Sequence, residues 1–359
     1  IPSEALNIPP HGFRTVSLGR AISTDGTVTV DFTMVQKIDL PLVKAGHILG
    51  QDQVIAAESA ENSRLAELLA ADSKSGEVAY RETDRKILVD GGHFRYVYNK
   101  ETGLFESMVY DNRTILEKPM EYNIWRAPTD NDRDVRLQWE AAGYHRASSR
   151  AYSTSVVKED GAVVIRSKAA MLAVIVQRIA EMDVCWTVSP DGSVKGDMAV
   201  EKTDVMPYLP RFGLRLFLPE SMGKVEYFGY GPLESYADKH RASRLGRFEA
   251  CADCLHEDYL KPQENGSHWG CRYVRAGCGD TGLVVWGQSF SFNASRYTQE
   301  ELTAKAHNFE LEKSGCTVLC LDAQMSGIGS NSCGPELLPQ YRVGAEPITM
   351  HLTLKPCTK

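Results

Sequence analysis

The sequence lacks any uninterrupted apolar stretch of the roughly 20 residues that a membrane-spanning helix requires. It also lacks a long run of charges of one sign, although its 359 residues carry a formal net charge of −7. We therefore expect no membrane partner and no nucleic-acid partner, because either would be recognised through a strongly basic segment. No internal repeat or low-complexity tract is present, and the length suffices for one large β domain plus a smaller one.

A complete disulfide framework is also missing, because the nine cysteines are an odd number. Reduced thiols are therefore the default expectation. Cys251 and Cys254 have the spacing of half a zinc site, but Cys271 and Cys278 lie seven residues apart and do not supply a second close pair. We expect no metal in this chain, and the cysteine count does not decide the compartment.

Strand-length segments with turn residues between them make up most of the sequence. The clearest lies near the C-terminus, where the apolar residues of 348–354 alternate with Thr and His. Many such segments at spacings of roughly 8 to 12 residues predict an all-β protein built as a large antiparallel sandwich. One short helix is predicted at 298–302, where Thr298 and Glu301 fit a capping box.

The composition changes once along the chain, and this change predicts the domain boundary. Residues 1–60 have the pattern of strands, residues 61–85 are rich in Ala, Leu and Glu and are expected to form a linker, and strand patterns resume over residues 86–359. We therefore expect two domains, of which the second is the larger.

Two polar clusters could carry chemistry. Trp125–Asp132 packs an aromatic, a cation and acids around a proline, which fits either a carboxylate site for hard cations or a rigid corner with capped backbone amides. Glu264, His268 and Trp269 supply an acid, an imidazole and an aromatic face, which are the ingredients of a sugar contact. An ordered loop is the alternative for this second cluster, and its residues are the weaker of our sugar-contact candidates.

Five segments of the chain form an ordered set: Trp125–Asp132, Gly229–Asp238, Pro262–Gly266, Phe292–Tyr297 and Gly327–Gly329. They resemble segments that occur in the same order in family 2 β-galactosidases. The resemblance covers about residues 86–359 and implies the small-chain domain of that family, a large antiparallel supersandwich with a galactose mutarotase-like fold. Residues 44–53 resemble the end of the preceding immunoglobulin-like domain, so residues 1–60 are expected to form only the C-terminal half of that β-sandwich, with an exposed sheet edge.

The chemistry that the resemblance implies is the retaining hydrolysis of terminal β-galactosides by two glutamates on a barrel, near magnesium and sodium. None of the barrel's motifs is present, so no catalytic residue is expected in this chain. The implied role is accessory, and the expected partners are the catalytic barrel and N-terminal domains of the same enzyme, a β-galactoside substrate and further copies in a homo-oligomer.

The same resemblance points to one loop as substrate-proximal. Family members carry a tryptophan in the loop after Gly-Ile-Gly, and that residue reaches into the sugar site. In this sequence Cys333 takes its position, so Asn331, Ser332 and Cys333 are the candidates nearest the substrate. The exchange removes an aromatic stacking platform. Because Gly, Ser and Asn dominate 327–335, we expect an exposed loop with a reactive Cys333 thiol.

Two other functions are compatible with these residues. A free-standing mutarotase-like enzyme would use His268 and Glu264 as its acid and base. A galactoside-binding module would hold its ligand on exposed aromatics such as Trp269 or Trp286.

Overall fold

The computed structural model describes residues 8–17, 19, 21, 26–59, 62–70, 76–174, 178–330 and 334–358. The chain divides into two compact units, Ile1–Arg64 and Leu65–Lys359. The short helix α1, Ser63–Ala70, contains the boundary and lies inside the segment that we predicted as a linker. None of the helices in the described ranges is both long enough and apolar enough to cross a bilayer.

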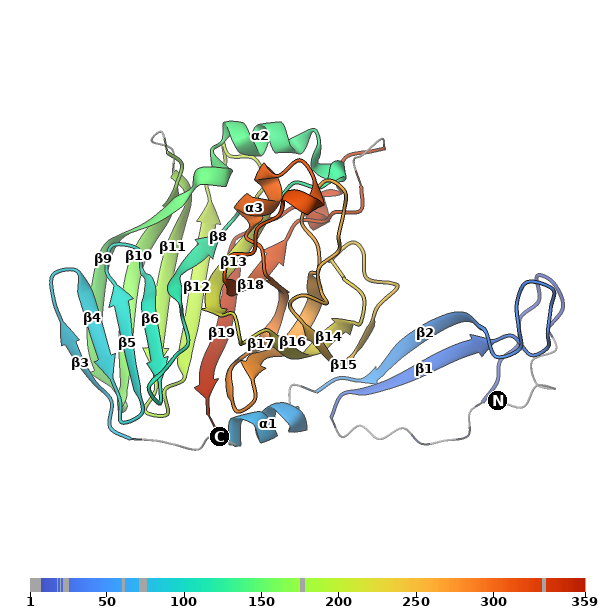
Figure 1. Ribbon diagram of the computed structural model, residues 1–359, viewed down its shortest axis with the longest axis horizontal. Helices are drawn as coiled ribbons and strands as arrows, with labels where there is room; N and C mark the ends of the chain where they lie inside the picture. The colour runs from blue at the N-terminus through green and yellow to red at the C-terminus, as the bar shows by residue number, and fades with distance from the viewer. Residues whose placement is uncertain are drawn as a thin grey trace. The chain divides into compact units, whose positions relative to one another are not determined.

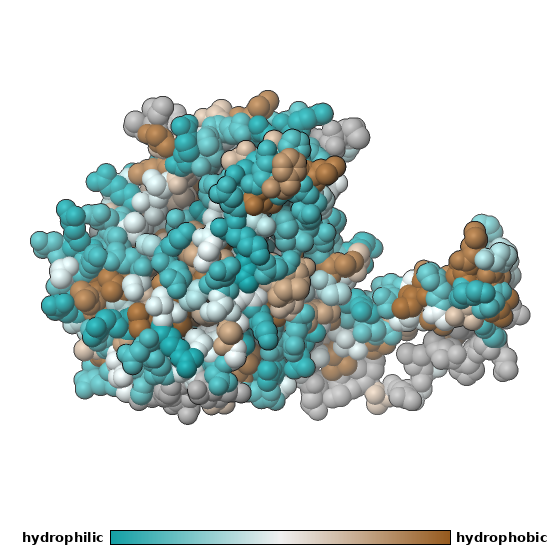
Figure 2. Space-filling model, viewed as in Figure 1, coloured by the Kyte–Doolittle hydropathy of each residue, from teal (hydrophilic) through white to brown (hydrophobic). Residues whose placement is uncertain are grey.

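The first unit is represented in its described residues by a two-stranded antiparallel sheet, β1 (Val28–Val35) and β2 (Ile48–Ala57). Five apolar side chains of these two strands are each more than half exposed, namely Met34, Val35, Ile48, Leu49 and Val54. Figure 2 shows hydrophobic residues gathered along the hairpin. Two strands alone bury too little surface to be stable in water. The described residues of this unit form no closed sandwich, and the immunoglobulin-like assignment stays a prediction.

The second unit begins with a five-stranded antiparallel sheet in sequential order. Its strands are β3 (Ala79–Glu82), β4 (Lys86–Asp90), β5 (Phe94–Asn99), β6 (Leu104–Tyr110) and β7 (Arg113–Thr114). In β5 the alternate residues Phe94, Tyr96 and Tyr98 are buried, as expected for a strand with one face on a core. β3 lies within the predicted linker and adds a strand before residue 86.

Among the described residues, a twelve-stranded sheet forms the rest of the second unit. Its main path runs β15-β14-β16-β17-β19-β12-β11-β10-β9, and a branch runs from β17 through β18 and β13 to β8. The strands are β8 (Lys118–Asn123), β9 (Ser148–Glu159), β10 (Ala162–Leu172), β11 (Arg178–Val188), β12 (Val194–Lys202), β13 (Arg211–Pro219), β14 (Lys224–Gly231), β15 (Arg244–Cys251), β16 (His268–Cys278), β17 (Thr281–Ser295), β18 (Cys316–Met325) and β19 (Ile348–Cys357). All described pairings are antiparallel, which confirms the all-β sandwich expected from the sequence.

Part of the core of the second unit lies between the five-stranded sheet and strands β9–β12. These form two layers in Figure 1. Phe105 of β6 packs edge-on against Trp186 of β11, with ring centroids 5.4 Å apart. Tyr96 donates its hydroxyl to the Gly192 carbonyl at 2.7 Å, so the buried hydroxyl keeps a partner. Each of these buried aromatics contributes roughly 1.5–3 kcal/mol relative to exposure.

Two further helices, α2 (Val135–Ala141) and α3 (Gln299–Ala304), lie at the same end of the strands in Figure 1. Trp139 docks α2 by donating its indole N–H to the Tyr208 carbonyl at 2.8 Å. The predicted helix start is confirmed, because Thr298 is the N-cap of α3 and accepts the Glu301 N–H at 3.2 Å. Short 3-10 turns complete the unit: η2 (Asp130–Asp132), η3 (Tyr144–Arg146), η4 (Asn308–Glu310) and η5 (Pro339–Tyr341).

Candidate functional site

The five segments that carry the family resemblance meet in space, although they are spread over about 200 residues of sequence. The Glu264 N–H donates to the Ala127 carbonyl at 2.9 Å and so joins the Pro262–Gly266 segment to the Trp125–Asp132 corner. Asn293 donates its side-chain amide to Glu264 at 3.2 Å and adds the fourth segment. The remaining two segments join through Arg126 and Asp238. We call this assembly the motif cluster.

Arg126 is the centre of the motif cluster and is fully buried. Its guanidinium forms a two-pronged pair with Asp132, at 3.0 and 2.6 Å. It also donates to the backbone carbonyls of Ser326 and, at 3.1 Å, Gly327. A bidentate pair with two further carbonyl acceptors uses the fork geometry of arginine and leaves little freedom. This geometry favours the rigid-corner interpretation of Trp125–Asp132 over a cation site.

Asp238 fixes the turn at Gly327–Gly329 from the other side. Its carboxylate accepts the N–H groups of Ile328 at 3.1 Å and Gly329 at 2.8 Å. Asn131 donates its side-chain amide to the Ile328 carbonyl. The turn is therefore held by side chains from two other segments, Trp125–Asp132 and Gly229–Asp238, and the chain that follows it starts from a defined position.

The substrate-proximal candidates follow this turn directly, but Asn331, Ser332 and Cys333 lie outside the described residues. On either side of them, Gly329 and Gly334 are exposed. The predicted reactivity of the Cys333 thiol therefore stays a prediction.

Glu264, a candidate sugar contact, lies in a buried ion-pair network with Arg211. Arg211 donates to Glu264 at 2.7 Å and to Asp322 at 2.8 Å, and the side chains of both carboxylates are fully buried. Burial raises the pKa of Asp322 to about 6, although attraction to Arg211 opposes the shift. The second Glu264 oxygen accepts the Ala127 N–H at 3.2 Å. This geometry favours the ordered-loop alternative and leaves Glu264 closed to a ligand.

His268 is buried in the core beside Tyr227 and Phe292. Its Nδ1 lies 3.1 Å from both the Tyr227 hydroxyl and the Tyr230 carbonyl. Burial lowers the pKa of His268 to about 4, so the ring is neutral over the physiological range. It shares no described hydrogen bond with Glu264, so the structure does not assemble the acid–base pair of a mutarotase-like enzyme from these two residues.

Trp269 borders a pocket. It is half-buried, and its ring stacks on His240 with centroids 4.3 Å apart and an interplanar angle of 22°. Its backbone N–H donates to Ser235 at 2.9 Å. Trp269 lines a pocket of about 220 Å³ together with residues 289–291, residues 323–325, which precede the Gly327–Gly329 turn, and residues 340–343.

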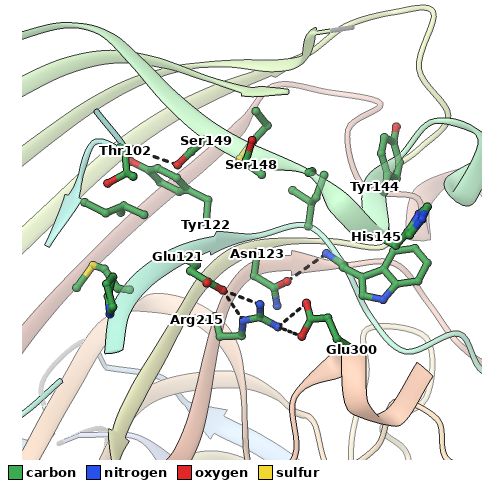
Figure 3. Close-up of a pocket in the computed structure, with 17 residues that line it drawn as sticks. Thr102, Glu121, Tyr122, Asn123, Tyr144, His145, Ser148, Ser149, Arg215 and Glu300 are labelled. Carbon is green, nitrogen blue, oxygen red and sulfur yellow. Dashed lines mark hydrogen bonds and ion pairs between the residues drawn. The ribbon is translucent and has the colours of Figure 1, made fainter. Parts of the chain in front are cut away.

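A second pocket, of about 300 Å³, lies beside β8 and is drawn in Figure 3. Arg215 is placed between two carboxylates, donating to Glu121 at 2.6 Å and to Glu300 at 2.8 Å. Burial raises the pKa of Glu300, but the attraction and hydrogen bonds of Arg215 outweigh it, so the pKa is lowered overall. The ionised carboxylate is therefore favoured at neutral pH, which works against Glu300 as a proton donor.

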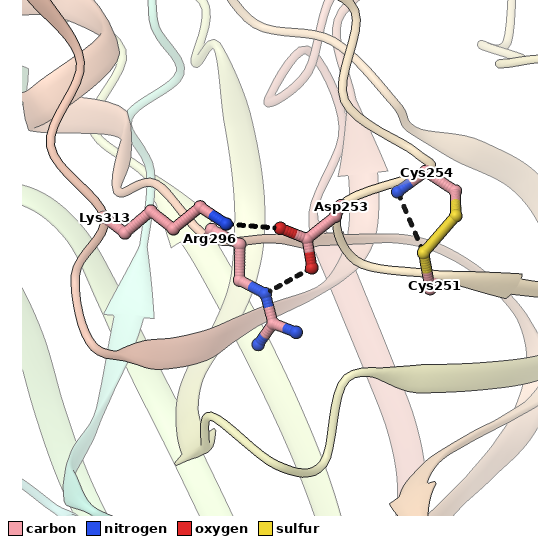
Figure 4. The surroundings of a disulfide bond; sticks show 5 residues. All are labelled: Cys251, Asp253, Cys254, Arg296 and Lys313. Carbon is pink, nitrogen blue, oxygen red and sulfur yellow. Dashed lines mark hydrogen bonds and ion pairs between the residues drawn. A yellow bond between two sulfur atoms is a disulfide. The ribbon is translucent and has the colours of Figure 1, made fainter.

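The Cys251–Cys254 pair differs from the reduced-thiol expectation. The two residues form a disulfide across a turn after β15, with a sequence separation of 3 (Figure 4). Between them, Asp253 accepts from Lys313 at 2.7 Å and from Arg296 at 2.9 Å, and these hydrogen bonds lower its pKa. The spacing that suggested half a metal site also permits this short bridge. In the described part of the chain, no three His, Cys, Asp or Glu residues gather as metal ligands.

Sequence reasoning missed Arg211 and Asp322, although they hold the site together. A signal for Arg211 was available, because it opens β13, a strand that is otherwise mostly apolar. A charge in such a run predicts a buried ion pair. Asp238 belongs to one of the five segments, but its role in holding the turn was not predicted, because its partners lie 90 and 91 residues away.

Comparison with known proteins gives a consistent result. Residues 90–354 match the family model described as the β-galactosidase small chain. The chain is 42% identical over 302 residues to a β-galactosidase of Actinobacillus pleuropneumoniae, covering 84% of this chain and 29% of that protein. It is 33% identical over 351 residues to a β-galactosidase of Staphylococcus xylosus, covering 97% of this chain and 35% of that protein. The chain thus spans about a third of the length of these relatives.

Two solved structures that match this chain share little sequence with it. A galactose mutarotase-like protein from Lactobacillus casei covers 76% of this chain and all of its own, with a TM-score of 0.38 and 10% identity. A galactose 1-epimerase from Lactobacillus acidophilus covers 79% of this chain and 99% of its own, with a TM-score of 0.42 and 8% identity.

Proposed function

The chain belongs to the β-galactosidase small-chain family, and we propose that it is an accessory C-terminal part of a family 2 β-galactosidase that hydrolyses terminal β-galactosides. The observation that carries the proposal is the family match over residues 90–354 together with two relatives named β-galactosidase. Each relative extends well beyond the segment that this chain matches, which leaves room for a catalytic barrel elsewhere.

The carboxylates of the described residues support an accessory role. A retaining glycosidase needs two carboxyl groups about 5 to 5.5 Å apart across the scissile bond, one as acid and base and one as nucleophile. Glu264 and Asp322 are close to each other through Arg211, but both are buried. Glu121 and Glu300 are likewise bridged by Arg215. In our proposal the catalytic glutamates, with magnesium and sodium, belong to the barrel outside this chain.

In this proposal the motif cluster positions the loop that follows Gly327–Gly329. Arg126 and Asp238 hold the turn at Gly327–Gly329, and the loop that follows starts from this turn. We propose that the loop forms one wall of the active-site cleft when the barrel docks, with Asn331, Ser332 and Cys333 nearest the substrate. A rigid base matters here, because a displacement of about 1 Å at a reacting group can reduce a rate by about 100-fold.

The mutarotase-like alternative finds less support. It requires a surface acid and base, whereas Glu264 is 2% exposed and His268 is 1% exposed. Proton transfer to a bound sugar requires hydrogen-bond reach to it, and two residues so deeply buried do not provide that reach.

Two assays of the purified chain alone distinguish the accessory function from the mutarotase-like one. We expect no hydrolysis of a chromogenic β-galactoside and no acceleration of galactose anomer interconversion followed by proton NMR. Hydrolysis that survives repurification would contradict the accessory role. Faster anomer interconversion that is lost on substituting a residue of either described pocket would favour the mutarotase-like enzyme instead.

A further inference from the structure

The pocket beside Trp269 is formed across three neighbouring strands of the large sheet. β17 pairs with β16 at Phe290 and Cys271, and with β18 at Ser291 and Asp322. Residues 289–291 line the pocket from β17, residues 323–325 line it from β18, and η5 with the two residues after it completes this part of the lining. The backbone of η5 is tied to the motif cluster, because the Gly327 N–H donates to the Tyr341 carbonyl at 3.0 Å. The pocket is therefore a fixed feature beside the turn.

Aromatic rings form one side of this pocket. Trp269 is held by the stacked His240 and by Tyr230, whose ring centroid lies 5.0 Å from that of Trp269. Tyr341 lines the pocket as well and is half-buried. A pre-positioned indole can pack against the C–H face of a sugar ring without first losing rotamer freedom.

The rest of the lining is polar but nearly uncharged. Ser289, Gln324 and Gln340 are exposed, and none of these side chains makes a hydrogen bond to another described residue. Arg342 is the one cation of the lining, and it is already engaged with Glu336 and the Leu337 carbonyl, each at 2.8 Å. Amides and a hydroxyl both donate and accept, as sugar hydroxyl groups do, whereas a committed arginine offers little to an anion.

We propose that this pocket binds one ring of a neutral saccharide, with Trp269 as its stacking platform and the amides of Gln324 and Gln340 as its hydrogen-bonding partners. Its volume of about 220 Å³ fits a single ring, being below the roughly 300 to 1,000 Å³ of pockets for drug-sized ligands. The site goes beyond the accessory function, because its residues all belong to this chain and need no barrel to bind. One ring in an open site predicts a Kd on the order of 1 mM.

The test is a titration of the full chain with galactose, glucose and lactose, followed by tryptophan fluorescence and saturation-transfer NMR. Saturable binding is expected for at least one of them. The fluorescence change should disappear in Trp269→Phe and persist in Trp286→Phe, because Trp286 lies outside the pocket lining. Gln324→Ala and Gln340→Ala should each weaken binding about fivefold, the effect of one lost neutral hydrogen bond.

Gln288→Ala is the matched control, because Gln288 is an exposed glutamine of β17 outside the lining. The proposal is overturned if no saturable binding occurs, if Gln288→Ala weakens binding as much as Gln324→Ala, or if a sugar phosphate binds more tightly than its neutral parent. The readout is binding to the chain itself. Its failure is therefore distinguishable from failure of the proposed function, which is read from hydrolysis.

Discussion

Gly327→Ala should loosen the turn that carries the proposed active-site loop. A Cβ at this position would lie 2.5 Å from the Asp238 carboxylate and 2.8 Å from a Leu337 methyl group. Real Cβ atoms do not approach this closely, so the Asp238 side chain must move. That movement separates the carboxylate from the N–H groups of Ile328 and Gly329, which it now accepts at 3.1 and 2.8 Å.

The magnitude follows from these two bonds. A hydrogen bond to a charged group contributes roughly 1.5 to 3 kcal/mol, and the half-buried Asp238 should lie at the lower end. Loss of both bonds would therefore cost about 3 kcal/mol of local stability. Since 1.4 kcal/mol is a factor of ten in an equilibrium constant, amide exchange at Ile328 and Gly329 should accelerate by roughly 100-fold.

Hydrogen exchange of the peptide around Gly327 measures this directly, with Gly334→Ala as the control in the same loop. A Cβ at Gly334 would meet nothing within 4 Å. We expect the control to exchange like the unmodified chain at Ile328 and Gly329. Equal exchange in the two variants would refute the idea that Asp238 holds the turn.

Three further predictions concern the interior and the disulfide. Because the pKa of His268 is about 4 in the folded state and about 6.5 when unfolded, its stabilising effect is fully present above pH 6.5 and is lost as the pH falls towards 4. The loss should reach about 3 kcal/mol in acid denaturation and be absent in His268→Phe. Arg211→Met should destabilise the second unit by about 3 to 5 kcal/mol in urea unfolding, because it leaves buried carboxylates without a cation. Reduction of Cys251–Cys254 should lower stability by at most about 2 kcal/mol, since the bridge closes a very short loop.

Controls make each of these measurements decisive. A parallel pH dependence in the unmodified chain and His268→Phe would contradict the assignment of acid sensitivity to this ring. An effect of Arg211→Met no larger than that of a surface arginine such as Arg136→Met would contradict the buried network. A loss well above 2 kcal/mol on reduction that is absent in Cys254→Ala would contradict the short-loop estimate, whereas a loss that persists in Cys254→Ala would not come from this bridge.

The fold class could be predicted from the sequence, because apolar and polar residues alternate along a strand that has one buried face. In β19 the buried positions Ile348, Met350, Leu352 and Leu354 alternate with polar ones, and the structure has the same alternation. The start of α3 was predicted for a similar reason, since Thr298 and Glu301 are close in sequence and their contact is local. The motif cluster was harder, because Arg126 and Gly327 are 201 residues apart and no local pattern records their contact.

The candidate site was predicted only in part, because residue type does not reveal burial. Glu264 and Trp269 are close in sequence, yet the carboxylate enters a buried network while the indole faces a pocket. The difference arises from Arg211 on β13, which brings a cation to Glu264 from 53 residues away. Likewise the spacing of Cys251 and Cys254 suits a metal or a disulfide, and local sequence does not decide between them.

The most direct test of the accessory function is a reconstitution. The chain, a fragment of the same enzyme carrying the proposed barrel, and their mixture are each assayed for hydrolysis of a chromogenic β-galactoside. We predict that neither part is active alone, and that the mixture recovers an activity that Gly327→Ala lowers and Gly334→Ala does not. Full activity of the barrel fragment alone, unchanged when this chain is added, would contradict the account.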